Sequence, residues 1–128
     1  MPTHRLVTTL IVVSALALAC AETTAQVVPI TPDALLASPP AGALILDVRT
    51  ADEYAGGHVP GAVNVPYDQV AARLTELGDD PTRPVIVYCE SGRRAGRAES
   101  LLLEVGFTDV RHLEGDMKAW RASGRVTE

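Results

Sequence analysis

The 128-residue sequence has few cysteines, no excess of positive charge and no hydrophobic run long enough to span a membrane. Its 11 lysines and arginines stand against 16 aspartates and glutamates, which gives a formal net charge of −5. Nucleic-acid binding needs a basic face, so this balance argues against a nucleic-acid partner. The sequence also has neither repeats nor low-complexity segments, and its length suits one domain.

The first 25 residues differ in composition from the rest of the chain. His4 and Arg5 precede a run of 14 uncharged residues, 6–19, and small residues follow that run. A membrane span needs about 20 apolar residues, whereas a shorter run with these flanks is typical of a signal peptide. We therefore predict a signal peptide over residues 1–25 and a folded domain over residues 26–128.

Two cleavage points are open for this leader. Residues 16–20, Leu-Ala-Leu-Ala-Cys, resemble a lipoprotein signal, in which Cys20 is lipidated and becomes the first mature residue. Ordinary cleavage after Ala19, Ala21 or Ala25 is the alternative. Both predict an exported protein of the periplasm or cell envelope, with the membrane involved only through a lipid on Cys20.

Only two cysteines, Cys20 and Cys89, are present. Exported domains often pair their cysteines in disulfides, but Cys20 lies in the predicted leader, which leaves Cys89 unpaired. A lone thiol in an oxidising compartment is a hazard unless it has a function. Cys89 is therefore the first candidate for a functional residue.

Short apolar segments alternate with short helical ones after the leader, a pattern that favours an α/β fold. A central, mainly parallel five-stranded sheet flanked by helices is expected. Thr50 and Glu53 have the spacing of a capping box, and Trp120 is predicted to lie in the core. The strands are predicted at residues 27–30, 43–48, 62–65, 85–88 and 110–113, and the helices after Thr31 and Thr50 and at residues 69–77, 95–105 and 117–122.

Residues 89–94, Cys-Glu-Ser-Gly-Arg-Arg, connect the most strand-like segment to a helix. Ligands of parallel sheets bind beyond the carboxyl ends of the strands, where the next helix offers unpaired N–H groups and its positive dipole end. Gly92 permits the positive φ that a tight loop needs, and Arg93 and Arg94 add positive charge. These features favour the nucleophilic thiolate of Cys89. The alternative is a buried structural cysteine beside a solvated helix face.

The sequence resembles a single-domain rhodanese over residues 30–126. Glu90 departs from the family pattern, because a basic or neutral residue is more common there, and Asp116 stands where many members have a second glycine. The segments that carry the resemblance are Leu46-Asp47-Val48-Arg49, Glu53-Tyr54, residues 57–66 (Gly-His-Val-Pro-Gly-Ala-Val-Asn-Val-Pro), Val87-Tyr88-Cys89, Ser91-Gly92-Arg93-Arg94-Ala95, Leu113-Glu114-Gly115 and Ala119-Trp120.

This resemblance implies a rhodanese-like fold and a sulfurtransferase that uses no metal or organic cofactor. Cys89 would take a sulfane sulfur from thiosulfate or a related anionic donor as a persulfide, and would pass it to cyanide, a small thiol or a protein thiol. Arg49 is either a further contact of the donor or the ion-pair partner of a neighbouring acid. The residues implied to bind the donor and the transferred sulfur are Glu90, Ser91, Gly92, Arg93 and Arg94.

Two alternatives to this activity are open. Related Cys-dependent phosphatases and arsenate reductases place five residues between Cys and Arg, whereas four separate Cys89 from Arg94. The shorter loop suits one sulfur atom better than a tetrahedral oxyanion. The alternative from another class is a non-catalytic adaptor or a persulfide carrier.

Several polar residues outside the loop are expected to have structural or surface roles. Asp47 is predicted to be a hydrogen-bonding partner, and His58 a hydrogen-bonded part of its turn. His112 is predicted to be an ordinary surface residue. The side chain of Glu90 is expected to point outward to solvent.

Overall fold

Five short strands form one wholly parallel sheet in a computed structural model that describes residues 24–128. Cys20 and nearly all of the predicted leader lie outside the described residues. The strands are β1 (Val28–Ile30), β2 (Leu44–Asp47), β3 (Val63–Asn64), β4 (Val85–Tyr88) and β5 (Val110–Leu113). Their order is β1-β5-β4-β2-β3, and each neighbouring pair is parallel, which confirms the predicted five-stranded sheet.

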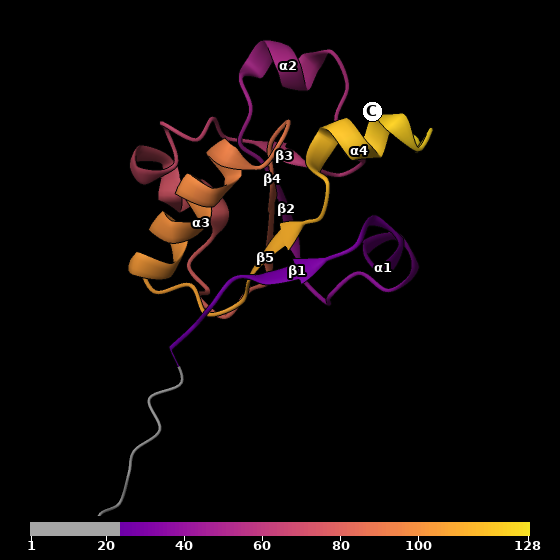
Figure 1. Cartoon of the computed structure of the whole chain (residues 1–128). Helices are drawn as coiled ribbons and strands as arrows, with labels where there is room; N and C mark the ends of the chain where they lie inside the picture. Colours follow the sequence, from indigo (N-terminus) through magenta and orange to yellow (C-terminus); the bar gives the residue numbers. More distant parts are fainter. Residues whose placement is uncertain (1–23) are drawn as a thin grey trace, which may run out of the picture.

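Helices cover both faces of this sheet (Figure 1). Helix α3 (Arg93–Glu104) and the 3-10 helix η1 (Ala71–Leu77) lie on one side, and α1 (Pro32–Ala37) and α4 (Asp116–Ala122) lie on the other. Helix α2 (Ala51–Ala55) lies beyond the carboxyl ends of the strands. No helix within residues 24–128 is long and apolar enough to cross a bilayer.

Alternation along β4 explains why the domain has two hydrophobic cores. Val85 and Val87 point to the core under α3 and η1, while Ile86 and Tyr88 point to the core under α1 and α4. All four side chains are buried, as expected for a central strand covered on both faces. Trp120 belongs to the second core, which confirms its predicted burial.

The helix starts follow the capping signals in the sequence. The Thr31 hydroxyl accepts a hydrogen bond from the Ala34 N–H at the start of α1. Thr50 and Glu53 form the predicted capping box at the start of α2, because each side chain bonds the backbone N–H of the other residue. These local bonds satisfy N–H groups that a helix start would otherwise leave without partners.

The segment predicted as a helix over residues 69–77 is a kinked 3-10 helix instead. Arg73 interrupts it with φ −119° and ψ 24°. A 3-10 helix rises about 2.0 Å per residue and an α-helix about 1.5 Å, so the 3-10 form extends further for the same number of residues. This extension accompanies burial of both ends of the segment, at Val70 and Leu77. The segment is therefore helical where the sequence predicted a helix, but its helix type differs.

Candidate active site

Cys89 lies directly after β4, at the edge of the sheet where all five parallel strands end. Its side chain is only 1% exposed. The Cys89 sulfur accepts a hydrogen bond from the Gly92 N–H, with 3.0 Å between Sγ and the nitrogen. The Cys89 backbone makes two hydrogen bonds that hold the strand end in place. Its N–H donates to the Asp116 carboxylate (2.9 Å), and its carbonyl accepts from the Met117 N–H (3.0 Å).

Gly92 closes the loop and is the N-cap of α3. Its φ of 104° confirms the predicted positive value, which side chains rarely adopt. A Cβ atom at this position would lie 3.1 Å from Oδ2 of Asp116, so the loop also has little space for a larger residue. The Cys89 sulfur consequently faces the first turn of a 12-residue helix, whose dipole favours negative charge at this end.

Arg94 connects the loop to α2. Its guanidinium forms a bidentate pair with Glu53, at 2.7 and 3.0 Å. The hydrogen bonds of this pair lower the pKa of Glu53 to about 2 and raise the pKa of Arg94. The neighbouring Cys89 sulfur also raises the pKa of Arg94, by less than Glu53 does. Arg94 therefore places a permanent positive charge beside the sulfur. Arg93 and Ser91 are exposed at the rim of the same loop.

Arg49 forms the ion pair that was one of its two predicted alternatives. Its guanidinium makes a bidentate pair with Asp47 and also donates to the Gly57 carbonyl at 2.8 Å. Asp47 is buried and accepts from the Tyr88 hydroxyl at 2.8 Å as well, so its predicted role as a hydrogen-bonding partner is confirmed. Burial, first, and the Asp47 charge, second, raise the pKa of Tyr88. Contact between Arg49 and a donor stays a prediction.

From the sequence, the Glu90 side chain was expected to point outward to solvent, but the structure pairs it with two arginines. Its carboxylate contacts Arg121 on α4 and lies 3.7 Å from Nη1 of Arg49. The side chain remains about a third exposed, with a relative exposure of 31%. Glu90 thus brings a negative charge to two guanidinium groups next to the Cys89 loop.

His112 is not an ordinary surface residue, and that prediction is wrong. Its imidazole lies between two buried carboxylates: Nδ1 contacts Glu99 on α3, and Nε2 is 3.1 Å from Oδ2 of Asp116 on α4. The hydrogen bond to Asp116, and then that to Glu99, raise the pKa of His112 to about 10. The imidazole is therefore protonated at neutral pH. One feature of the sequence could have indicated this cluster, namely the position of the charged residue Glu99 on the apolar face of its helix.

We predict that His112 makes the free energy of unfolding depend on pH. Its pKa is about 10 in the folded chain and 6.5 as an ordinary histidine, so its stabilising contribution is complete below pH 6.5 and is lost as the pH rises through 10. The loss is on the order of 3 kcal/mol. Urea unfolding between pH 6 and 10.5, compared with the His112→Gln variant, measures it. Parallel pH curves for the two proteins would contradict the prediction.

His58 has the structural role expected for it. Its ring stacks on Tyr54 with 3.7 Å between the centroids, and its Nδ1 is 3.0 Å from the Tyr54 carbonyl oxygen. These contacts join the end of α2 to the turn that leads into β3. The imidazole therefore has a structural role in this turn.

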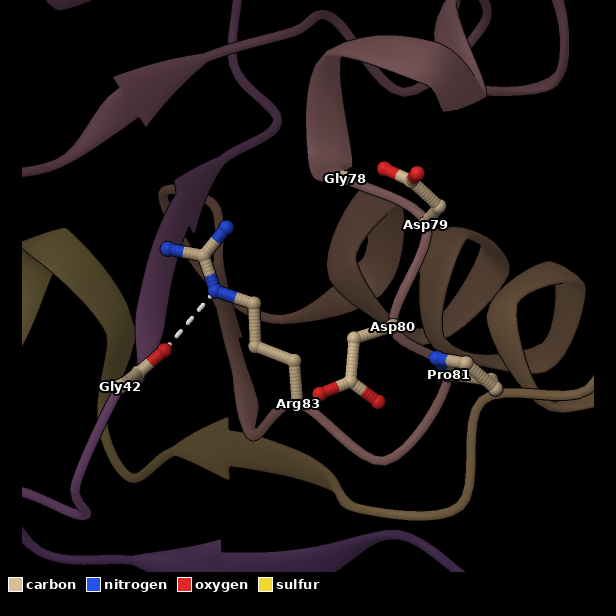
Figure 2. Close-up of a pocket in the computed structure, with 6 residues that line it drawn as sticks. All are labelled: Gly42, Gly78, Asp79, Asp80, Pro81 and Arg83. Carbon is tan, nitrogen blue, oxygen red and sulfur yellow. Dashed lines mark hydrogen bonds between the residues drawn. The ribbon is translucent and has the colours of Figure 1, made fainter.

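A surface hollow of about 670 Å³ lies at the opposite edge of the sheet from Cys89. It is formed where β2 and β4 begin, and Arg83 crosses it to donate to the Gly42 carbonyl at 2.8 Å (Figure 2). None of the predicted site residues lines it. Within residues 24–128, no group of three or more His, Cys, Asp or Glu side chains is arranged to hold a metal ion.

The chain belongs to the rhodanese-like domain family, because residues 31–123 match the model of that domain. Thiosulfate sulfurtransferase PspE of Escherichia coli is 39% identical over 70 residues, which are 55% of this chain and 67% of PspE. Thiosulfate sulfurtransferase 16, chloroplastic, of Arabidopsis thaliana is 37% identical over 98 residues, 69% of this chain and 82% of that protein. The match to YqhL of Bacillus subtilis, 40% identical over 78 residues, spans 61% of this chain and 60% of YqhL.

Solved structures agree with this assignment. A structure described as rhodanese with anions from E. coli is 31% identical, with a TM-score of 0.58 over 67% of this chain and 96% of that one. A rhodanese-related protein from Thermoplasma volcanium, 21% identical, has a TM-score of 0.68 over 79% of this chain and 97% of its own. The second likeness concerns the fold alone. The rhodanese-like fold that the sequence resemblance implied is therefore confirmed.

Proposed function

We propose that the protein is a sulfurtransferase that carries a sulfane sulfur as a persulfide on Cys89. The observation that supports this best is the bond from the Gly92 N–H to the Cys89 sulfur, made at the start of α3. A backbone N–H and a helix N-terminus aimed at one sulfur atom stabilise negative charge on that atom. Thiosulfate is the donor we favour, because two of the relatives are named thiosulfate sulfurtransferases.

The transfer proceeds in two displacement steps. The Cys89 thiolate attacks the outer sulfur of thiosulfate, the sulfur–sulfur bond of the donor breaks, and sulfite leaves with the electron pair. The enzyme then holds a Cys89 persulfide anion. Cyanide or a thiolate acceptor attacks the terminal sulfur, takes it as thiocyanate or a new persulfide, and releases the Cys89 thiolate. No proton needs to move in the cyanide reaction.

The surrounding charges suit an anionic donor. Arg94 is fixed by Glu53 beside the sulfur, and Arg93 is exposed at the first position of α3. The developing negative charge on the attacked and leaving sulfur atoms lies near these guanidinium groups and the N-terminus of α3. Preorganised donors of this kind stabilise a transition state without reorganising during the reaction.

An intact-mass measurement tests the proposal. Incubation with thiosulfate should add about 32 Da, one sulfur atom, to Cys89, and cyanide should remove that mass as thiocyanate. A stable adduct that cyanide or thiols remove only slowly would identify a persulfide carrier. Hydrolysis of a phosphate ester with no thiocyanate formed would favour the phosphatase alternative. A reactive thiol that never gains sulfur would refute the proposal.

We also propose that the protein is exported to the periplasm or cell envelope. The support is the composition of residues 1–25, namely a short basic start, 14 uncharged residues and small residues near the end. The mass of the protein purified from cells reports its first residue. A lipid on Cys20 and cleavage after Ala19, Ala21 or Ala25 give different masses, while the mass of the full 128-residue chain would contradict export.

Glu90 is expected to weaken thiosulfate binding. Its carboxylate is paired with Arg49 and Arg121, and it repels a dianion that approaches the same loop. We predict that Glu90→Gln lowers the KM for thiosulfate by about 3- to 10-fold at low salt and leaves kcat within about twofold, a gain that shrinks as salt screens the charge. Initial rates of thiocyanate formation at two ionic strengths measure this.

A matched control removes an exposed carboxylate from the far end of α3, the helix that follows the Glu90 loop. Glu104 is the last residue of α3, roughly 16 Å along the helix axis from Arg93. Glu104→Gln changes the net charge by the same amount and should leave KM unchanged. Equal effects of the two substitutions would mean that net charge, and not the position of Glu90, controls donor binding.

A further inference from the structure

Asp116 has a backbone conformation that favours glycine. Its φ is 54°, and among residues 24–128 it is the one non-glycine residue with a positive φ. It follows Gly115, whose φ is 79°. A left-handed conformation is unfavourable for a residue with a side chain, although aspartate tolerates it better than most. Such strain persists only where surrounding contacts hold the residue in place.

The Asp116 carboxylate lies directly beneath the Cys89 loop. Its Oδ1 accepts the Cys89 N–H at 2.9 Å, and its Oδ2 would be 3.1 Å from a Cβ atom on Gly92. The carboxylate therefore contacts the loop where it begins and packs against the residue that donates to the sulfur. The side chain is almost completely buried, with 3% exposure.

His112 and Glu99 hold this carboxylate in one orientation. The His112 imidazole bonds Oδ2 of Asp116 through Nε2, and Glu99 through Nδ1. A doubly protonated imidazole is the form that can donate to a carboxylate on each side, and this form is positively charged. This charge offsets the Asp116 carboxylate, which would otherwise oppose negative charge on the sulfur nearby. The three groups come from α3, β5 and α4, and they join both faces of the sheet to the loop.

We propose that Asp116, oriented by His112 and Glu99, is a positioning residue that sets the Cys89 backbone so that the sulfur meets the Gly92 N–H. It acts through the Cys89 N–H and does not contact the sulfur. The proposal rests on the proposed sulfur transfer for its kinetic consequence. Asp116, which stands where many members of the family have a second glycine, thereby has a role in holding the Cys89 loop.

Two substitutions at this position separate positioning from stability. Asp116→Gly removes the acceptor of the Cys89 N–H but relieves the strain at φ 54°, so the losses and gains in stability partly cancel. Asp116→Asn keeps an oxygen acceptor and tolerates the same φ. We expect Asp116→Gly to lower kcat by about 10- to 100-fold with KM for thiosulfate within about twofold, and Asp116→Asn to restore kcat to within about threefold of the wild type.

Hydrogen exchange of the Cys89 backbone amide supplies a readout that does not need sulfur transfer. Loss of the acceptor should speed this exchange at least about tenfold in Asp116→Gly and leave it nearly unchanged in Asp116→Asn. Arg111→Gln is the matched control. It removes an ion pair with Asp109 at the start of β5, the end of the strand that lies away from the Cys89 loop. That variant should keep wild-type kcat and Cys89 exchange.

The outcomes are distinct. Slow Cys89 exchange and wild-type kcat in Asp116→Gly would overturn the positioning role. Equal loss of kcat in both Asp116 variants would also overturn it, since charge and not the acceptor would then matter. If the wild type transfers no sulfur, the proposed function fails, and the Cys89 exchange rates of the two variants still decide whether Asp116 positions the loop.

Discussion

Serine in place of Cys89 should abolish the proposed sulfur transfer. We expect thiocyanate formation from thiosulfate and cyanide to fall by at least about a thousandfold in Cys89→Ser, because a hydroxyl is neither ionised nor able to carry a persulfide. The fold should be kept, since serine is close in size and its oxygen can accept the Gly92 N–H as the sulfur does. The assay is thiocyanate release, with urea unfolding in parallel, and the free energy of unfolding should change by less than about 1 kcal/mol.

The second cysteine provides the control for this variant. Cys20 is the only other cysteine in the sequence, so in the unprocessed 128-residue chain Cys20→Ser tests whether the transferred sulfur resides on Cys89 alone. It should retain full turnover and the added mass after thiosulfate treatment. Turnover that survives in Cys89→Ser and disappears in Cys20→Ser would exclude the mechanism.

Alanine in place of Asp47 should destabilise the domain more than any change on its surface. The substitution leaves the Arg49 guanidinium buried, at 2% exposure, without its bidentate partner. It also removes an acceptor of the Tyr88 hydroxyl. Loss of one partner of a buried ion pair costs about 3–5 kcal/mol, a large part of the 5–15 kcal/mol that stabilises typical domains. The midpoint of urea or thermal unfolding measures this loss.

Two further variants show whether the unpaired charge is the cause. Asp109→Ala breaks an ion pair that is about a third exposed on both sides, and it should cost less than about 1 kcal/mol. Replacing both members of the buried pair, as Asp47→Leu with Arg49→Met, removes the unpaired charge and should be less destabilising than Asp47→Ala alone. A double variant as unstable as Asp47→Ala would attribute the loss to the shape of the site.

The positions of the strands and the Cys89 loop were predictable because their signals are local. Val85 to Tyr88 are apolar and β-branched or aromatic, which favours a buried strand wherever it lies in the sheet. Thr50 and Glu53 cap α2 through contacts three residues apart. Gly92 has the positive φ that a short loop before a helix favours. The helix type of η1 was missed, since apolar spacing alone does not distinguish a kinked 3-10 helix from an α-helix.

The charged contacts around the site were less predictable. Glu90 was expected in solvent and contacts Arg121, which is 31 residues away in the sequence. His112 was expected on the surface and lies between Glu99 and Asp116. These pairings depend on the order of the strands in the sheet. Helix α3 follows β4 and helix α4 follows β5, and because β4 and β5 are neighbours, both helices begin close together. No local rule carries that information.

The sequence was enough to predict the α/β fold, the cysteine at the end of a strand, and the loop of four residues between Cys89 and Arg94. Periodicity, capping and glycine conformation act between near neighbours, and therefore they are readable from the chain. Folding was needed to show that Arg49 is buried in a pair with Asp47 and that Asp116 accepts the Cys89 N–H. Cys89 and Asp116 are 27 residues apart, so their bond forms only where distant segments meet. Asp47 and Arg49 are two residues apart, but the strength of both contacts comes from the burial that packing creates.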